Sequence, residues 1–392
     1  MQQPLAGIDV IDMGQIYQGG YCGLLLAYLG ANVVKVEPPW GENVRTRSAD
    51  GKPPQVQFLN ANKRGITLDL RSEEGAEALT DLAETADVLL ENFSTGTMER
   101  LGLGYDVLSE LNPELIYAHG SGFGDDGPYA ERPAMDLTIQ AMSGVMDTTG
   151  FPDGPPVKAG PAVSDFMGGV HLALGIVAAL HRRERTGFGD YVEVGMFDCM
   201  YPTLASPVSA LVRERDAPPR TGNRHSGLAI APYNVYEVAD GYVAIICISE
   251  RHWRSLTSVM GREELAEKEG YDSKAARAER MEEIDAIVAD WLDGRSADGV
   301  EARLLEANVP CAKVRSVEEV IDDPHLRERG MVTDLPNQGD GRSEVPVPGM
   351  PISFAGSANP EVTQAPLLGE HTAEVLAELG YDDDRIDRAS GS

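Results

Sequence analysis

Short apolar segments and helical segments alternate through the first half of the chain. The predicted strands span residues 5–12, 32–37, 66–70, 88–90, 115–119 and 191–196. The predicted helices between them span residues 21–29, 72–85 and 166–183. Strands that alternate with helices form a parallel sheet covered on both faces, because each crossover helix packs back onto the sheet. The sequence therefore predicts an α/β fold.

The character of the chain changes between residues 202 and 223, where Pro, Arg and Thr accumulate and indicate a linker. Beyond it, two apolar segments flank Asp240-Gly241, which is typical of a β-hairpin. Apolar residues at helical spacing predict a helix over residues 281–292. We therefore expect a large domain made of residues 1–205 and 330–392, and a small domain with linkers made of residues 206–329.

The chain is strongly acidic. It has 63 Asp and Glu against 33 Lys and Arg, and a formal net charge of −30. This charge repels nucleic acid and anionic membranes, so neither is an expected partner. An acidic excess with few lysines is typical of a halophilic protein, whose surface repulsion is screened in high salt. An ordinary acidic enzyme is the alternative.

The cysteines and the N-terminus indicate an intracellular protein. The four cysteines are scattered and form no C-x-x-C pair, so we expect neither a disulfide framework nor a metal site. The N-terminus lacks the basic and apolar regions of a signal peptide. We expect a soluble cytoplasmic protein.

Asp165 is the acidic residue whose position best suits it to catalysis. It stands at the start of the long apolar segment expected to form the helix over residues 166–183. Unpaired N–H groups and the positive end of the helix dipole would keep such a carboxylate ionised and suited to nucleophilic attack. The alternative is that Asp165 or Ser164 only caps the helix.

A glycine-rich turn follows the first predicted strand. Gly14, Gly19, Gly20 and Gly23 lie before a helix, and Glu37 ends the next strand, which would suit an NAD-binding oxidoreductase. The spacing is not G-x-G-x-x-G, however. Arginines and lysines also gather in the first hundred residues, where they form ion pairs with acidic neighbours or a local basic surface for a phosphorylated ligand.

Motifs along the whole chain resemble those of the class III CoA-transferases, the group of formyl-CoA transferase and carnitine CoA-transferases. The matching segments are residues 29–37, 62–70, 91–93 with Arg100, 149–150, 154–156, the Asp165 segment, 187–194, 222–225 and 366–372. The resemblance implies a Rossmann-like large domain, a smaller α+β domain and a homodimer of interlocked subunits. It also implies acyl-CoA and a small carboxylic acid as substrates, and no metal or other cofactor.

The resemblance assigns roles to individual residues. It makes Asp165 the nucleophile that accepts the acyl group. It places CoA contacts at Gln15, Ile16, Tyr17, Gln18, Gly19, Leu68, Arg71, Asn92, Phe93 and Arg100. We also expect backbone N–H groups near the 15–19 turn, and a glycine-rich segment, to stabilise the oxyanions of acyl transfer.

Two departures from the family pattern affect these assignments. Pro38 follows Glu37 where a basic residue is often found, so Arg45 or Arg47 is expected to replace it. The α-methylacyl-CoA racemases share the aspartate but carry a histidine before the position of Asp136. Here Met135 stands there, so one base of a two-base proton exchange is missing and the pattern favours a transferase.

The turn at residues 14–17 resembles members that move CoA from succinyl-CoA to C4 and C5 dicarboxylates, with mesaconate the leading acceptor. The alternatives are malate, citramalate or an intramolecular transfer within mesaconyl-CoA. A second carboxylate needs a cation or several hydrogen bonds. Arg224, Gln15, Tyr17 and Gln18 are the candidates, although Arg224 also suits a domain-interface ion pair.

Overall fold

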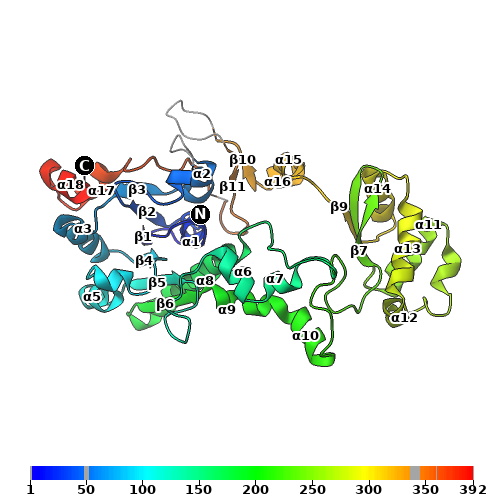
Figure 1. Cartoon of the computed structure of the whole chain (residues 1–392). Helices are drawn as coiled ribbons and strands as arrows, with labels where there is room; N and C mark the ends of the chain where they lie inside the picture. The colour runs from blue at the N-terminus through cyan, green and yellow to red at the C-terminus, as the bar shows by residue number, and fades with distance from the viewer. Residues whose placement is uncertain (1, 48–52, 336–344, 359, 392) are drawn as a thin grey trace. The chain divides into compact units, whose positions relative to one another are not determined.

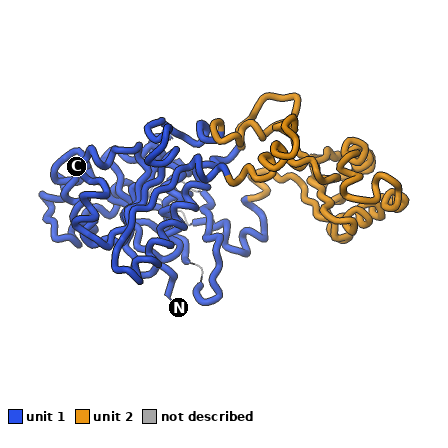
Figure 2. Tube along the Cα trace, turned by 90° about the horizontal axis from the view of Figure 1, so that it is seen from below, with its two compact units in different colours: residues 1–140, 160–201, 321–392 blue, residues 141–159, 202–320 orange. Residues whose placement is uncertain are grey.

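We describe a computed structural model of the chain, covering residues 2–47, 53–335, 345–358 and 360–391 (Figure 1). The chain forms two compact units (Figure 2). The first contains residues 1–140, 160–201 and 321–392, and the second contains residues 141–159 and 202–320. The second unit thus takes in residues 141–159, which the sequence analysis placed in the large domain. This segment packs with the later chain, where Gly150 O accepts a hydrogen bond from Gly222 N.

A six-stranded parallel sheet forms the centre of the first unit. The strands, in spatial order, are β3 (Arg64–Thr67), β2 (Asn32–Glu37), β1 (Asp9–Asp12), β4 (Val88–Glu91), β5 (Ile116–Ser121) and β6 (Asp190–Gly195). The order reverses between β1 and β4, and in doubly wound sheets ligands bind at the carboxyl ends of the strands beside this point. The α/β prediction is confirmed.

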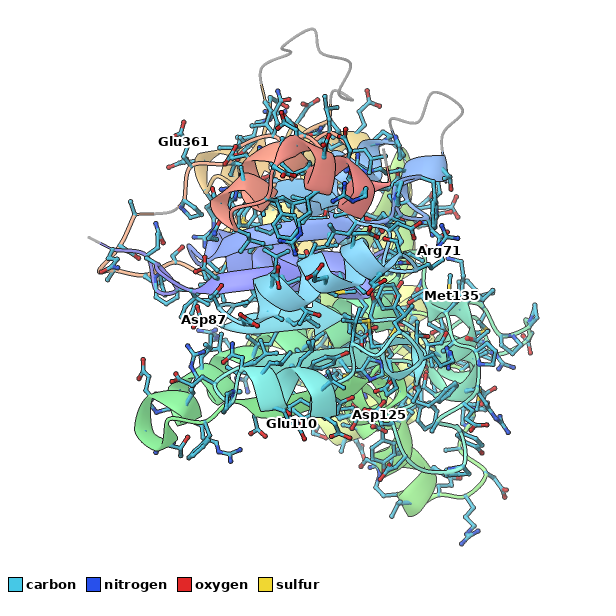
Figure 3. The ribbon with its side chains drawn as sticks, turned by 90° about the vertical axis from the view of Figure 1, so that its left-hand side faces the viewer. Arg71, Asp87, Glu110, Asp125, Met135 and Glu361 are labelled. Carbon is cyan, nitrogen blue, oxygen red and sulfur yellow. The ribbon has the colours of Figure 1, made fainter. Side chains whose placement is uncertain are left out.

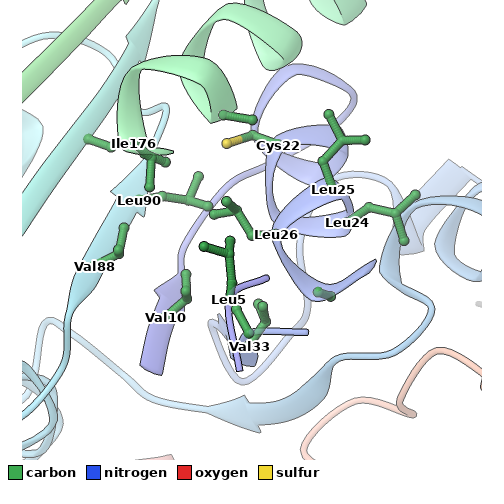
Figure 4. Close-up of a cluster of buried hydrophobic side chains, with 14 of the residues drawn as sticks. Leu5, Val10, Cys22, Leu24, Leu25, Leu26, Val33, Val88, Leu90 and Ile176 are labelled. Carbon is green, nitrogen blue, oxygen red and sulfur yellow. The ribbon is translucent and has the colours of Figure 1, made fainter. Parts of the chain in front are cut away.

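Helices cover both faces of this sheet. One face packs against α1 (Gln18–Tyr28) and α8 (Val163–Thr186), with Leu26, Val33, Leu90 and Ile176 in the shared core (Figure 4). The other face packs against α3 (Glu73–Ala83), α5 (Tyr105–Leu111), α17 (Thr372–Glu378) and α18 (Asp383–Ser390). β2, β4 and β5 are buried along almost their whole length because both of their faces are covered.

The remaining elements of the first unit are short. They are α2 (Pro54–Asn60), α4 (Thr97–Arg100), α6 (Asp136–Met142), α9 (Met196–Met200), α16 (Pro324–Glu328), the strands β10 (Val332–Thr333) and β11 (Val347–Pro348), and the 3-10 helices η1 (Arg45–Arg47) and η2 (Tyr201–Leu204). The chain passes from one unit to the other within α6, η2 and α15 (Val317–Ile321). α4 follows β4, α6 follows the long loop after β5, and α9 follows β6. All three helices therefore come after the carboxyl ends of strands, where the site is expected.

The second unit is a small α+β body. The predicted hairpin forms β7 (Tyr233–Val238) and β8 (Gly241–Ile246), which pair antiparallel, and β9 (Cys311–Lys313) adds to β8. Its helices are α7 (Val145–Thr148), α10 (Ala205–Arg213), α11 (Glu250–Met260), α12 (Lys274–Glu279), α13 (Met281–Leu292), α14 (Ala297–Glu306) and α15 (Val317–Ile321), with η3 (Glu263–Ala266). α13 covers the predicted 281–292 range, and its Ile284, Val288 and Leu292 are buried.

α8 is long and apolar enough to cross a membrane by length and composition alone. Half of its apolar window is buried within the protein, where it packs against α1, β5 and β6. This packing is typical of the central helix of a doubly wound domain, so the apolar run is explained by the sheet that it covers.

Candidate active site

Asp165 is the third residue of α8, because the helix begins at Val163, three residues earlier than predicted. The capping position belongs to Ala162, whose side chain makes no cap hydrogen bond. The interpretation of Asp165 or Ser164 as the helix cap is therefore wrong. Instead, the Asp136 carboxylate accepts a hydrogen bond from Ser164 N at 2.9 Å and occupies one of the unpaired donors of the first turn.

The environment of Asp165 favours its neutral form more than the helix terminus alone would suggest. The residue is only 9% exposed. Burial raises the pKa of Asp165 to about 7, the negative charge of Asp136 adds to this rise, and the positive charge of Arg47 opposes it. The helix N-terminus alone therefore does not fix this carboxylate in its ionised form, because burial and the charge of Asp136 raise its pKa.

The turn after β1 is held in place by side chains from distant parts of the chain. Asn92 accepts a hydrogen bond from Gln15 N at 2.6 Å and donates one to Gln15 O at 3.1 Å. Glu42 accepts from Ile16 N at 2.9 Å, and Ile16 has a positive φ of 57°. Such strained backbone persists where the surroundings fix it. Asn92, placed by the end of β4, thus sets the conformation of the turn that ends β1.

These bonds limit one expectation about catalysis to the other N–H groups of the 15–19 turn. The N–H groups of Gln15 and Ile16 point to Asn92 and Glu42, so they are not available to an oxyanion. In the same region, Glu37 binds both Nε and Nη2 of Arg45 at 2.7 Å. Arg45 therefore does not offer a free guanidinium fork to a phosphate, and Glu37 does not offer a free carboxylate to a ribose.

The turn lies against α8 because two helices approach closely. A Cβ on Gly169 would lie 2.6 Å from the carbonyl oxygen of Gln18 on α1, so only glycine fits this position. The buried Gln18 side chain extends between Gly120 and Gly168, where a Cβ on either glycine would lie within 3.0 Å of its amide nitrogen. Gly168 and Gly169 thus allow α8 to pack closely against Gln18.

A cavity of about 540 Å³ opens at the carboxyl ends of β1, β4 and β5. Seven predicted site residues line it: Gln15, Ile16, Gln18, Asn92, Phe93, Arg100 and Asp165. Met135 also lines it, so the residue that replaces the racemase histidine faces the same space as Asp165. In Figure 3, Met135 and Asp125 lie toward the right of the view, and Asp87, which precedes β4, lies toward the left, at the opposite end of the strands.

A second cavity of about 250 Å³ holds the predicted nucleotide contacts. Leu68 and Arg71 line it, and Gln15 and Phe93 line both cavities. Arg71 pairs with Asp69 at 2.9 Å, and its guanidinium carbon lies 4.4 Å from the centroid of the Trp40 ring. The Arg71 side chain is 67% exposed, so this cation remains accessible.

Tyr17 and Gly19 belong to the turn but are not part of the walls of these two cavities. The Tyr17 ring stacks on Phe166, next to Asp165, at a centroid distance of 5.8 Å. Its hydroxyl lies 3.4 Å from Arg47 Nη1. Gly19 packs directly against Gly14, which explains the glycine without a ligand. Of the two candidate arginines, Arg47 is therefore the one near the nucleophile.

Sequence reasoning missed several groups at this edge of the sheet. Asn43, Arg132 and Met196 line the larger cavity. Behind Phe93 lies a buried ionisable pair, His119 and Glu91. Glu91 ends β4 and His119 stands opposite it near the carboxyl end of β5, and they could have been found from that position, since parallel strands bring their carboxyl ends to one edge.

Other candidates lie elsewhere. Arg224, proposed for a second substrate carboxylate, donates to Asp285 at 2.8 Å within the second unit. That bond explains the residue as an internal ion pair of this unit. Among the described residues, no group of three or more His, Cys, Asp and Glu side chains is arranged to hold a metal ion.

The fold and the cavity define an α/β enzyme with a buried carboxylate at the switch point of its sheet. The chain belongs to CoA-transferase family III, whose model matches residues 5–372. It is 39% identical to the succinyl-CoA:mesaconate CoA-transferase of Haloarcula hispanica, over 96% of this chain and 96% of that protein. It is 37% identical to the formyl-CoA:oxalate CoA-transferase of Streptomyces coelicolor, over 97% of each chain.

The fold agrees with this family. The crystal structure of a CAIB/BAIF family protein from Brucella suis matches 97% of this chain and 100% of its own, with a TM-score of 0.85 and 36% sequence identity. The fold class and the CoA-transferase class predicted from the sequence are both confirmed.

Proposed function

We propose that this enzyme transfers CoA from succinyl-CoA to a four- or five-carbon dicarboxylic acid, with mesaconate as the preferred acceptor. The observation that carries the proposal is the position of Asp165, a buried carboxylate in the wall of the same cavity as Asn92, Phe93 and Arg100. The named activity of the Haloarcula hispanica relative supports the choice of donor and acceptor.

The reaction uses Asp165 as the acyl and CoA acceptor in turn. Its carboxylate attacks the succinyl-CoA carbonyl, the C–S bond breaks, and a mixed anhydride and CoA thiolate form. The thiolate attacks the aspartyl carbonyl, which releases succinate and leaves an aspartyl-CoA thioester. The acceptor carboxylate then attacks this thioester and expels the thiolate. The thiolate finally attacks the acceptor carbonyl of the new anhydride, which forms the product CoA ester and restores Asp165.

The walls of the cavities supply the binding groups. Leu68 and Arg71 hold the nucleotide end of CoA in the smaller cavity, and Asn92, Phe93 and Arg100 guide the rest toward Asp165. The developing oxyanion requires donors that are not already bonded. Our candidate for this role is the amide of Gln18, beside Gly168 one turn along from Asp165. Its Nε2 carries two hydrogens, and Ser121 O, at 3.5 Å, accepts only one of them.

The second carboxylate of the acceptor requires a cation, since burying it unpaired is very costly. Arg100 and Arg132 are the basic residues that line the larger cavity in the described part of the chain. We assign Arg132 to this carboxylate because Arg100 is assigned to CoA.

Comparing kcat/KM for mesaconate and crotonate, with succinyl-CoA as donor, tests the dicarboxylate assignment. Crotonate is the monocarboxylic counterpart of mesaconate. A site built to bind a charged group discriminates against a substrate that lacks this group, so we expect kcat/KM for crotonate to be lower by at least ~100-fold. Equal values would reject the assignment and leave CoA transfer intact. Malate, citramalate and oxalate belong in the same panel, because relatives named for D-citramalate and oxalate are 33% and 37% identical to this chain.

A racemase activity is disfavoured by the cavity itself. Met135 lines it at the position of the racemase histidine, and no histidine is among the described residues that form its wall. Incubation with a 2-methylacyl-CoA in D₂O should therefore leave the α-hydrogen unexchanged. Exchange at a rate comparable to CoA transfer would overturn this conclusion.

We further propose an interlocked homodimer that works in a high-salt cytoplasm. Val170, Leu174 and Val177 form an exposed apolar stripe on α8 that suits burial against a second copy. The free cysteines and the net charge of −30 support the cellular setting. Light scattering in molar KCl should give a dimer, and Leu174→Glu should give monomers. A monomeric wild-type protein would refute the assembly.

A further inference from the structure

The backbone of Phe93 is held on both sides by buried ionisable groups. Glu91 accepts a hydrogen bond from Phe93 N at 2.7 Å, and His119 Nε2 lies 3.2 Å from Phe93 O. Glu91 and His119 are 4% and 3% exposed and occupy paired positions of β4 and β5. The segment that contributes Phe93 to both cavities is therefore fixed by two side chains that the reaction itself does not use.

The other nitrogen of the same imidazole reaches a second loop. His119 Nδ1 lies 2.8 Å from Asp125 Oδ1, and Tyr191 donates to the other oxygen of Asp125 at 2.6 Å. Asp125 N in turn donates to Glu193 on β6 at 3.0 Å. The chain that leaves Asp125 continues to residues 130–135, which line the larger cavity. One histidine thus connects the segment after β4 with the loop after β5.

The geometry favours a charged imidazole. Both ring nitrogens of His119 face acceptors, whereas a neutral imidazole donates from only one of them. The surroundings agree with this assignment. Burial lowers the pKa of His119, but the Asp125 carboxylate and the charge of Glu91 outweigh that effect and raise it to about 9.

We propose that His119 is a positioning residue for CoA: its imidazolium, held between Glu91 and Asp125, fixes the Phe93 segment and couples it to the loop after β5 that leads to residues 130–135 in the wall of the larger cavity. The inference rests on the proposed CoA contact of Phe93. It adds a group that touches no substrate and acts through the backbone of a residue that does.

The first test replaces His119 with glutamine, which cannot carry the charge. We expect KM for succinyl-CoA to rise about tenfold, equivalent to about 1.4 kcal/mol, with kcat within about twofold of wild type. Calorimetric binding of S-methyl-CoA, a thioether without a titrating thiol, should weaken equally. His181→Gln is the matched control, since His181 is an exposed histidine on α8 and should change neither value.

The second test uses pH, because a merely structural histidine would not link CoA affinity to its own charge. The titratable and charged groups that face His119 or its two carboxylates are Glu91, Glu99, Tyr117, Asp125, Tyr191 and Glu193. Burial raises the pKa of Glu91 to about 7, against the opposing charge of His119. Glu91 and His119 are therefore both mainly in their charged forms between pH about 7 and about 9.

S-methyl-CoA affinity should fall as pH rises through about 9, where His119 loses its proton. Asp125→Asn removes a carboxylate that stabilises the imidazolium, so the loss should begin at a lower pH. Asp126→Asn, at the exposed neighbouring position, is the control and should follow the wild type.

The outcomes separate this proposal from the proposed function. Wild-type protein that fails to bind S-methyl-CoA would refute both. If the wild type binds S-methyl-CoA and folded His119→Gln binds it equally tightly, the positioning role alone would be overturned. If His119→Gln does not fold, Asp125→Asn decides, and an unshifted pH profile in that variant would overturn the proposal.

Discussion

Replacing Asp136 with asparagine should raise the activity of the enzyme at acidic pH. Asp165 must be ionised to attack, and its pKa of about 7 lies about 3 units above the ordinary aspartate value. That difference equals about 4 kcal/mol of preference for the uncharged acid. Below pH 7, kcat/KM should therefore fall about tenfold per pH unit, because kcat/KM reports the free enzyme.

Asp136→Asn removes the second cause of the raised pKa and keeps an oxygen to accept from Ser164 N. Burial remains the larger cause, so we expect the pKa of Asp165 to fall by only about one unit. At pH 6 the ionised fraction would then rise from about 9% to about 50%, a fivefold gain relative to each enzyme's plateau.

The assay is kcat/KM for succinyl-CoA from pH 5 to 8.5 at constant high ionic strength. Circular dichroism at each pH controls for unfolding. A wild-type profile that stays flat to pH 5 would refute the argument, and so would a variant profile that coincides with the wild type.

Three further predictions concern CoA binding, packing and salt. Arg71→Ala and Arg100→Ala should each raise KM for the CoA ester and leave kcat nearly unchanged; normal kinetics in both would show that they serve only surface ion pairs. Gly169→Ala should lower the free energy of unfolding by about 1–3 kcal/mol, because its Cβ meets the Gln18 carbonyl oxygen at 2.6 Å, despite the helix preference for alanine. Gly160→Ala has no atom within 4 Å of its Cβ and is the control; equal melting temperatures would contradict the packing argument. With a net charge of −30, activity and assembly should be lost below a few tenths molar KCl, since the Debye length grows from ~3 Å at 1 M to ~10 Å at 0.1 M; full stability in dilute buffer would refute the halophile inference.

The elements of the fold follow from local pattern. The apolar run at 32–37 and the helical spacing at 281–292 match β2 and α13 residue for residue. Ser72 caps α3 by accepting from Gly75 N at 3.0 Å, so a cap residue in the sequence marks a real helix start. α1 and α8 each begin three residues before their predicted starts, because the small and polar residues before Tyr21 and Phe166 hide the first turn of each helix.

The contacts that shape the site depend on partners far apart in the chain. Asn92 lies 77 residues from Gln15 and accepts a hydrogen bond from the Gln15 N–H. Asp136 lies 28 residues from Ser164 and accepts one from the Ser164 N–H. Local periodicity carries no information on such pairs. The raised pKa of Asp165 was missed for the same reason, since it depends on burial and on the charge of a different helix.

The central claim is that Asp165 carries the acyl group and then CoA. Wild-type enzyme incubated with succinyl-CoA and then hydroxylamine should yield an aspartyl hydroxamate, located at residue 165 by peptide mass spectrometry. Asp165→Ala should remain folded, form no hydroxamate and retain less than a few per cent of transferase activity. A hydroxamate at another residue, or an active Asp165→Ala enzyme, would contradict the claim.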